Sequence, residues 1–309
     1  MFAYKSGCRV PLLLLAGIVL IFFNQLKALF QLAWTDDMVS HTVLIPFISY
    51  YLLSITNTKG GGGEITVAAA DKSGDKPALT GRRIGLPLLA SGLMIYGAAV
   101  LLPLGSGADH LSWTILAFVM CVAGAHFSFL DQAEAARSLF PCAFLIFMVP
   151  MPTFMLHGLE VFFQHASAEA ANMLLALTGT PMLRDGLMFQ IPGITIRVAE
   201  ECSGIRSSYV LFMTGLLAGH LFLKSPWRRF FLAAFVIPLG IFRNGFRIST
   251  IAMLCTHIGP EMIHSPIHHR GGPIFFVLSL IPFFAFLIWL YHMEQKKREK
   301  RAVTVPTER

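Results

Sequence analysis

Charged residues are scarce in this chain of 309 residues. Lys, Arg, Asp and Glu together make up 13% of it, whereas hydrophobic residues make up 55%. The mean hydropathy is +0.65. Polar residues are too few to cover the surface of a water-soluble globular protein of this size. The composition therefore excludes such a protein and indicates one that crosses a membrane several times.

Paired cysteines and ligand clusters are also missing. The five cysteines lie far apart without a C-x-x-C pair, and their odd number leaves at least one thiol unpaired. Neither a metal nor another cofactor is predicted. The glycine run at 60–63 is not part of a phosphate-binding loop. The net charge of +7 comes from short basic clusters between apolar runs, as in cytoplasmic loops, so no nucleic-acid partner is predicted.

Eight apolar segments are candidate membrane spans. They run roughly over 11–33, 42–55, 84–104, 112–130, 138–152, 203–223, 228–254 and 272–292. The second and the fifth are short for a bilayer, which needs about 20 residues. The expected fold is all-α, a polytopic transmembrane helical bundle of about eight spans that forms a single integral membrane domain over residues 1–309.

The basic clusters place both termini in the cytoplasm. Residues 56–83 are expected to be a flexible cytoplasmic loop, and residues 294–309 a basic cytoplasmic tail. The segment 153–201 is expected to face outward, on the periplasmic side, without spanning. Its first part has the apolar spacing of a helix along the outer surface, and residues 188–198 alternate like an extended strand or hairpin.

That extended segment leads to Cys202, within Ala199-Glu200-Glu201-Cys202-Ser203-Gly204. A cysteine at the start of a helix feels the unpaired backbone N–H groups and the positive end of the helix dipole, and both favour its thiolate. Cys202 is therefore a candidate nucleophile. The alternative is a small, buried apolar residue at a helix start.

Arg247 is a second candidate. Seventeen helical steps from Phe230 cover about 26 Å, nearly the thickness of the hydrocarbon core, so Arg247 is expected on the outer side. Asn244 lies three residues earlier and shares its helix face. An arginine cannot act as a base, so here it would bind an anion, unless Arg243 and Arg247 merely extend to the membrane interface.

A base has to come from elsewhere, and histidine is the natural supplier. His268 and His269 precede Gly271-Gly272 at the start of the last span, on the same predicted side. The alternative for either is an interfacial polar residue. Together the three kinds of side chain are expected to converge on one membrane face.

These motifs resemble those of the exosortase/archaeosortase family of bacterial multi-span cysteine enzymes. The family shows an A-x-x-C-S-G setting, here 199–204, and an N-x-x-R element, here 244–247. It also shows a histidine four residues before a glycine that opens the last span. His268 and Gly272 fit that spacing, and His269 is one residue out of register. The resemblance extends from about Trp34 to Leu280.

The resemblance implies that Cys202, Arg247 and His268 are catalytic. The supporting residues are expected to be Asn244, Ser203, Gly204, Arg206, His269 and Gly272. One departure concerns Glu200 and Glu201, because carboxylates beside the nucleophile disfavour a thiolate. Arg206 or Arg197 could offset them.

The implied substrate is a secreted protein whose C-terminal tail, inserted in the bilayer, has a short motif, an apolar helix and a basic cluster. The enzyme would lie in the bacterial inner membrane with its site on the outer face. There it would form a thioacyl intermediate that water or an unknown acceptor resolves. Two alternatives stay open: an exopolysaccharide export or lipid-linked sugar transport component, which needs no thiol, and a non-catalytic assembly scaffold.

Overall fold

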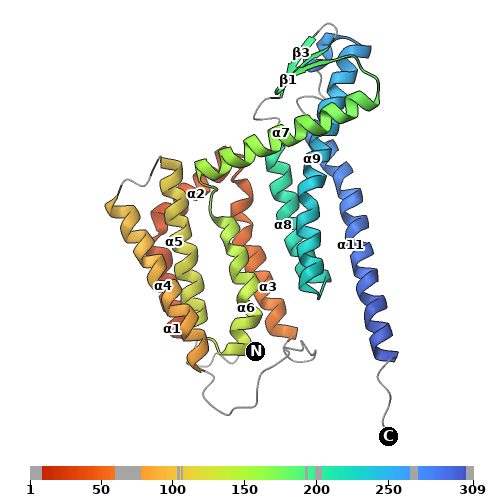
Figure 1. Cartoon of the computed structure of the whole chain (residues 1–309). Helices are drawn as coiled ribbons and strands as arrows, with labels where there is room; N and C mark the ends of the chain where they lie inside the picture. Colours follow the sequence, from red (N-terminus) through yellow and green to blue (C-terminus); the bar gives the residue numbers. More distant parts are fainter. Residues whose placement is uncertain are drawn as a thin grey trace. The chain divides into compact units, whose positions relative to one another are not determined.

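The computed structural model describes residues 9–59, 78–102, 105, 107–191, 194–198, 204–264 and 271–303. Residue contacts divide the chain into two compact units, Met1–Thr153 and Phe154–Arg309. The first unit is helical (Figure 1). Its elements are α1 (Arg9–Ile21), α2 (Phe23–Thr35), η2 (Ser40–Val43), α3 (Ile45–Lys59), α4 (Ala78–Leu101), α5 (Gly107–Ser128), α6 (Gln132–Phe144) and η3 (Leu145–Met148).

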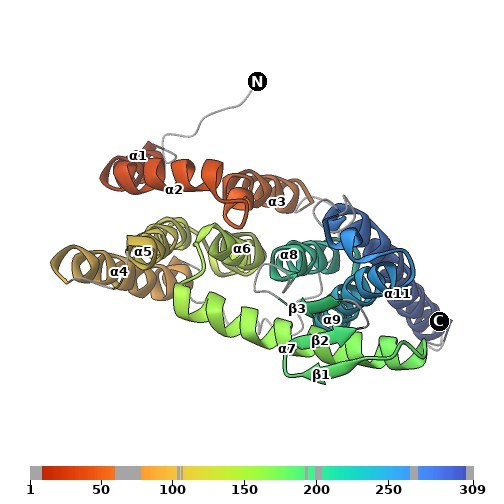
Figure 2. The same cartoon turned by 90° about the horizontal axis from the view of Figure 1, so that it is seen from above.

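In the first unit, α4 and α5 run side by side in both views (Figures 1 and 2). Glycines allow this close approach. A Cβ added at Gly85 would lie 2.5 Å from the backbone N of Ser128, and one added at Gly124 would lie 2.5 Å from the backbone N of Leu89. Small residues at such crossings are the usual means by which membrane helices pack closely.

The second unit combines long helices with a small sheet. Its elements are α7 (Thr153–Leu177), β1 (Leu183–Asp185), β2 (Met188–Ile191), β3 (Ile194–Arg197), α8 (Ile205–Phe222), α9 (Pro226–His257), η5 (Pro260–His264) and α11 (Gly272–Val303). Thr153, the first residue of α7, is the last residue of the first unit. The extended segment predicted over 188–198 is confirmed, because it contains the two strands β2 and β3.

The sheet is antiparallel in the order β1-β2-β3, and Phe189 pairs with Ile196 across β2 and β3. Ile196 and Val198 are buried whereas Thr195 and Arg197 are exposed, the alternation of a strand with one covered face. The covered face belongs to a core that also contains Ala168 and other residues of α7 and Ile248 and other residues of α9. This core fixes the end of β3, and with it the chain that leads toward Cys202.

Helices α8, α9 and α11 run alongside one another (Figure 1). Leu211, Leu232, Val236 and Phe283 are at most 1% exposed and form the centre of their shared core. Gly240 on α9 brings the helices together, because a Cβ there would lie 2.5 Å from the Oγ of Ser208 on α8. The second core of this unit is thus a three-helix packing.

Among the described residues, four helices are long and apolar enough to cross a membrane, or up to six if each bent helix pair counts as one span. The four include most of the predicted spans 84–104, 112–130, 228–254 and 272–292. The first predicted span, 11–33, is two helices that meet at a bend of 66° near Phe22. The chain is thus an all-α multi-pass membrane protein, and the count of eight spans stays a prediction.

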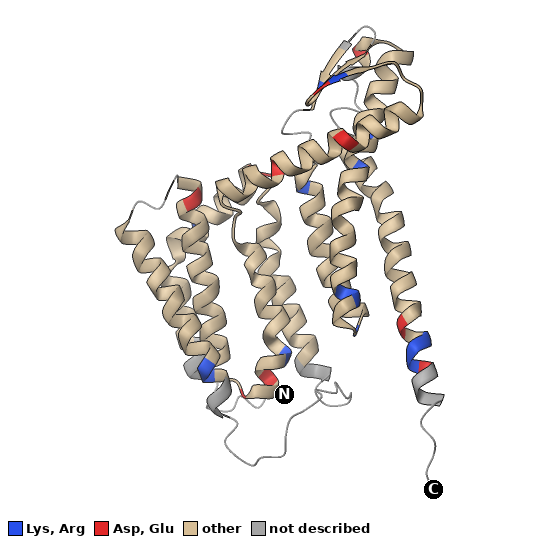
Figure 3. Ribbon diagram, viewed as in Figure 1, with Lys and Arg blue, Asp and Glu red and all other residues tan. Residues whose placement is uncertain are grey.

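Helix α8 carries Arg206 in its first turn, and the charges of α11 lie toward its C-terminal end. Helix α9 carries Arg228 and Arg229 in its first turn and also Arg243 and Arg247 in its interior (Figure 3). Glu294 lies in the C-terminal part of α11 and is 8% exposed. It accepts hydrogen bonds from the backbone N–H groups of Lys224 (3.2 Å) and Ser225 (3.2 Å) and lies 3.5 Å from the Nη1 of Arg228. Since α9 begins at Pro226, this places a negative charge at its positive dipole end.

We predict that Glu294→Ala lowers the free energy of unfolding by about 1–3 kcal/mol, because two backbone donors and a half-buried guanidinium lose their acceptor. The measurement is thermal aggregation of the detergent-solubilised protein. Glu299→Ala, an exposed carboxylate on the same helix, is the matched control. Equal melting of the two variants would contradict the role assigned to Glu294.

Candidate active site

Gly204 is the N-cap residue of α8 and lies close to α9. Gly204 has a φ of 70°, in the left-handed region that side chains disfavour. A Cβ added there would lie 3.0 Å from the Cγ of Asn244, 3.1 Å from its Oδ1 and 3.3 Å from the Nη2 of Arg243. Both the conformation and the close approach therefore require glycine at this position.

Arg243 of α9 donates hydrogen bonds to the start of α8. Its side chain is 7% exposed, and its Nη2 donates to the carbonyl oxygen of Gly204 (3.0 Å) and to the Oγ of Ser208 (3.1 Å). The same carbonyl accepts from the backbone N–H of Ser208 (3.1 Å) and the Oγ of Ser207 (3.1 Å). Arg243 thus points into the protein instead of extending to a membrane interface.

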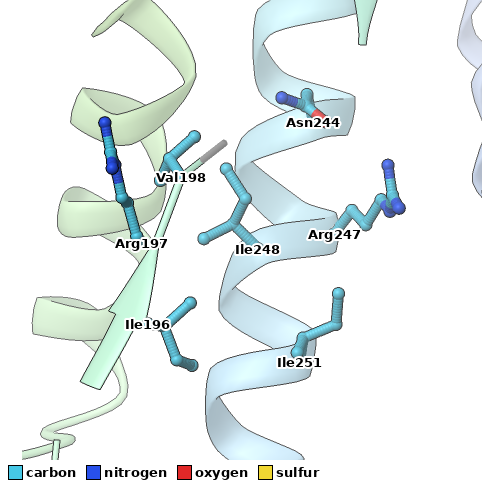
Figure 4. Close-up of a pocket in the computed structure, with 7 residues that line it drawn as sticks. All are labelled: Ile196, Arg197, Val198, Asn244, Arg247, Ile248 and Ile251. Carbon is cyan, nitrogen blue, oxygen red and sulfur yellow. The ribbon is translucent and has the colours of Figure 1, made fainter. Parts of the chain in front are cut away.

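Asn244 and Arg247 line one pocket, as their spacing on a helix predicts. The other lining residues are Ile196, Arg197, Val198, Ile248 and Ile251. Figure 4 shows apolar side chains between Arg197, on the strand side, and Arg247, on the helix side. Arg197 is exposed and Arg247 is half-buried. The pocket is therefore small and apolar, and the guanidinium groups of Arg197 and Arg247 point away from its apolar side chains (Figure 4).

Gln164 of α7 contacts Val198, the residue that follows β3. Its side chain is 5% exposed, and its Nε2 donates to the carbonyl oxygen of Val198 at 2.6 Å. The carbonyls of Val198 and Gly204 thus each accept a hydrogen bond from a buried side chain.

The start of the last helix lies close to the same part of α9. Phe275, in the first turn of α11, contacts Phe246 with a centroid separation of 6.0 Å. Phe246 is the neighbour of Arg247, and Gly272 is the first residue of α11. Arg206, in the first turn of α8, is exposed.

The remaining predicted site residues lie outside the described residues: Cys202, Ser203, His268 and His269. The meeting of the thiol, the guanidinium of Arg247 and the imidazole of His268 therefore stays a prediction. In the described part of the chain, no group of three or more His, Cys, Asp or Glu side chains could hold a metal ion.

A model of the transmembrane exosortase family matches residues 33–285. The chain belongs to this family. No curated protein sequence and no solved structure matches it. Exosortase membership gives the chain, in broad terms, the role of a cysteine transpeptidase or protease of the membrane, and it confirms the resemblance drawn from the motifs.

Two residues of this exosortase that donate hydrogen bonds to Val198 and Gly204 were not predicted as site residues. Arg243 looked like a candidate for the membrane interface, although it is adjacent to Asn244. Gln164 was read only as part of an amphipathic helix. Its signal was weak, because a single amide among apolar residues and histidines does not reveal which carbonyl it will meet 34 residues later.

We predict that Gly204→Ala lowers the free energy of unfolding by about 1–3 kcal/mol, because the left-handed conformation and the contact with Asn244 both oppose a methyl group. Thermal aggregation in detergent measures the effect. Gly158→Ala is the control, since Gly158 lies in α7 with nothing within 4 Å of an added Cβ. The two variants should differ, and a Gly204→Ala protein as stable as the control would refute this account.

Proposed function

We propose that this exosortase cleaves the C-terminal sorting tail of secreted proteins through a thioacyl intermediate on Cys202. The tail would consist of a short motif, an apolar helix and a basic cluster. The enzyme would act at the outer face of the bacterial inner membrane, with both of its termini in the cytoplasm. The membrane-inserted tail is then the protein partner, and an acceptor nucleophile would receive the product.

One observation carries this proposal: the contact of Gly204 with Asn244. Gly204 follows Cys202 by two residues, so covalent geometry limits the separation of their Cα atoms to about 7 Å. The contact thus ties the A-x-x-C-S-G element to the N-x-x-R element, although 40 residues separate Gly204 from Asn244 in the sequence. Family motifs that meet in space are expected of a catalytic site.

The proposed chemistry needs a nucleophile, a base and an anion-binding group. The thiolate of Cys202 would attack the carbonyl carbon of the scissile peptide bond while His268 holds the thiol proton. The tetrahedral oxyanion would collapse to a thioester, the C–N bond would break, and His268 would return the proton to the leaving amine. Water or an amine or hydroxyl acceptor would then attack the thioester and release Cys202.

Arg247 would stabilise the oxyanion. It lines the pocket beside β3, half-buried, and its helix contacts the first turn of α11 through Phe246 and Phe275. Since α11 begins at Gly272, His268 would enter the site from four residues earlier. Both assignments follow the family motifs, and the contacts around them favour a common location.

The test of the nucleophile is co-expression with a secreted reporter that ends in such a tail. We predict that the reporter is shortened by the wild type and stays at full length with Cys202→Ala and Cys202→Ser, as seen by electrophoresis and mass spectrometry. Equal expression of each variant in the membrane is the control. Processing that persists without the thiol would refute the enzyme proposal and favour a transporter or a scaffold.

For Arg247, we predict that Arg247→Gln slows reporter processing by about 10²- to 10³-fold, the usual effect of losing one oxyanion-stabilising group. Arg247→Lys should recover part of the rate because the charge remains. The control is Arg137→Gln, which removes an exposed arginine from α6. Time courses after induction give the rates, and an unchanged rate in Arg247→Gln would exclude this role.

A further inference from the structure

The sheet of the second unit ends in a strand with one open side. Its order is β1-β2-β3, and among the described residues β3 pairs only with β2. Figure 2 shows the three strands side by side, with β3 at the end of the row. A strand in that position presents backbone N–H and C=O groups that its own sheet does not bind.

The hydrogen-bond pattern identifies those groups. The backbone N–H of Val198, one residue after β3, donates to the carbonyl oxygen of Leu187 (3.0 Å), which precedes β2. In an antiparallel pair, residues that exchange hydrogen bonds with the partner strand alternate with residues that exchange none. Arg197 and Thr195, one and three residues before Val198, therefore direct their N–H and C=O groups away from β2. The open edge thus carries two donors and two acceptors.

No other part of the described chain binds these four groups. The turn, loop and cap hydrogen bonds of the described residues do not reach the backbone of Thr195 or Arg197, and both residues are exposed. Unpaired backbone groups at a sheet edge are a template for another extended chain. The edge of β3 therefore suits a partner whose main chain is extended and supplies the complementary donors and acceptors.

The location of the edge indicates which extended chain it meets. Arg197 lines the same pocket as Asn244 and Arg247, the two ends of the N-x-x-R element. Cys202 follows Arg197 by five residues, so covalent geometry keeps their Cα atoms within about 18 Å. The bond that Cys202 cleaves has to lie outside the apolar helix of the tail, because carbonyls inside a helix are already hydrogen-bonded. The short motif beside that helix is the non-helical part of the tail.

We propose that the short motif of the sorting tail binds as an added strand along the open edge of β3. This inference rests on the proposed function, because it takes the tail as the substrate. Four backbone hydrogen bonds to Thr195 and Arg197 hold about three residues of the motif, a length of about 10 Å. Main-chain pairing fixes the register of the motif, and its side chains then alternate between the two faces of the extended sheet.

Disulfide trapping tests this pairing without any cleavage. Thr195→Cys is made in a Cys202→Ala protein and combined with reporters that carry one cysteine at successive positions of the motif and its flanks. After oxidation of the membranes, we expect cross-links at every second reporter position, because side chains alternate along a strand. The same scan without Thr195→Cys gives the background from the native cysteines. Asp185→Cys is the matched control, since Asp185 is exposed on the same sheet face in β1, at the opposite edge.

A proline substitution tests the backbone donor. Thr195→Pro removes an N–H that points away from β2, so the pairing of β2 with β3 keeps its hydrogen bonds. We predict that this variant processes the reporter about 3- to 10-fold more slowly than Thr195→Val, the usual effect of one hydrogen bond. Both variants lack the hydroxyl group, and only Thr195→Val keeps the donor. Equal thermal aggregation of the two proteins in detergent excludes a loss of fold as the cause.

Several outcomes would overturn the inference. Cross-links that recur with the helical period of about 3.6 positions, or none above background, exclude an added strand. So do equal processing rates of Thr195→Pro and Thr195→Val. A dimer cross-linked through Thr195→Cys without any reporter would show that a second copy of this chain covers the edge instead.

Failure of this inference is distinguishable from failure of the proposed function. The trapping experiment uses Cys202→Ala protein, so it reports where the tail lies whether or not Cys202 is the nucleophile. If the wild type processes the reporter and Cys202→Ala does not, while trapping shows no alternation, only the added strand is refuted. If Cys202→Ala still processes the reporter, the proposed function fails.

Discussion

The site depends on the close approach of Gly204 to the α9 backbone at Arg243 and Asn244. A side chain larger than hydrogen would push α8 away from α9 there, since an added Cβ would already lie 3.0 Å from Asn244. Helices α8 and α9 also approach closely at Ser208 and Gly240. Because protein interiors are closely packed, a shift at this junction would move the start of α8 and the segment joined to it.

The structure separates two arginines that look alike in sequence. Arg243 and Arg247 are four residues apart, and hydropathy alone gives each the same choice between the interface and the interior. Packing decides it: Arg243 lies opposite Gly204 and Ser208, where it is covered, whereas Arg247 is half-buried at the edge of the pocket. The arginine of the N-x-x-R element is thus the more accessible of the two.

The sequence predicted most of the long apolar helices, the strand pair before Cys202 and the shared helix face of Asn244 and Arg247, because these follow from local periodicity. Its span count was less secure, since the bend near Phe22 depends on tertiary packing. The contacts of Gln164 with Val198 and of Arg243 with Gly204 could not be predicted. Each joins residues more than 30 positions apart, and no local pattern encodes such a pairing.

The contacts of Gln164 and Arg243 supply hydrogen bonds to backbone carbonyls that lie outside regular secondary structure. Outside a helix or sheet, backbone carbonyls lose their regular donors, and leaving them unsatisfied away from water is costly. Here a neutral amide serves the carbonyl of Val198 and a charged guanidinium serves that of Gly204. The asymmetry has a chemical consequence, because the positive charge lies on the α8 side, where the helix dipole already favours an anion.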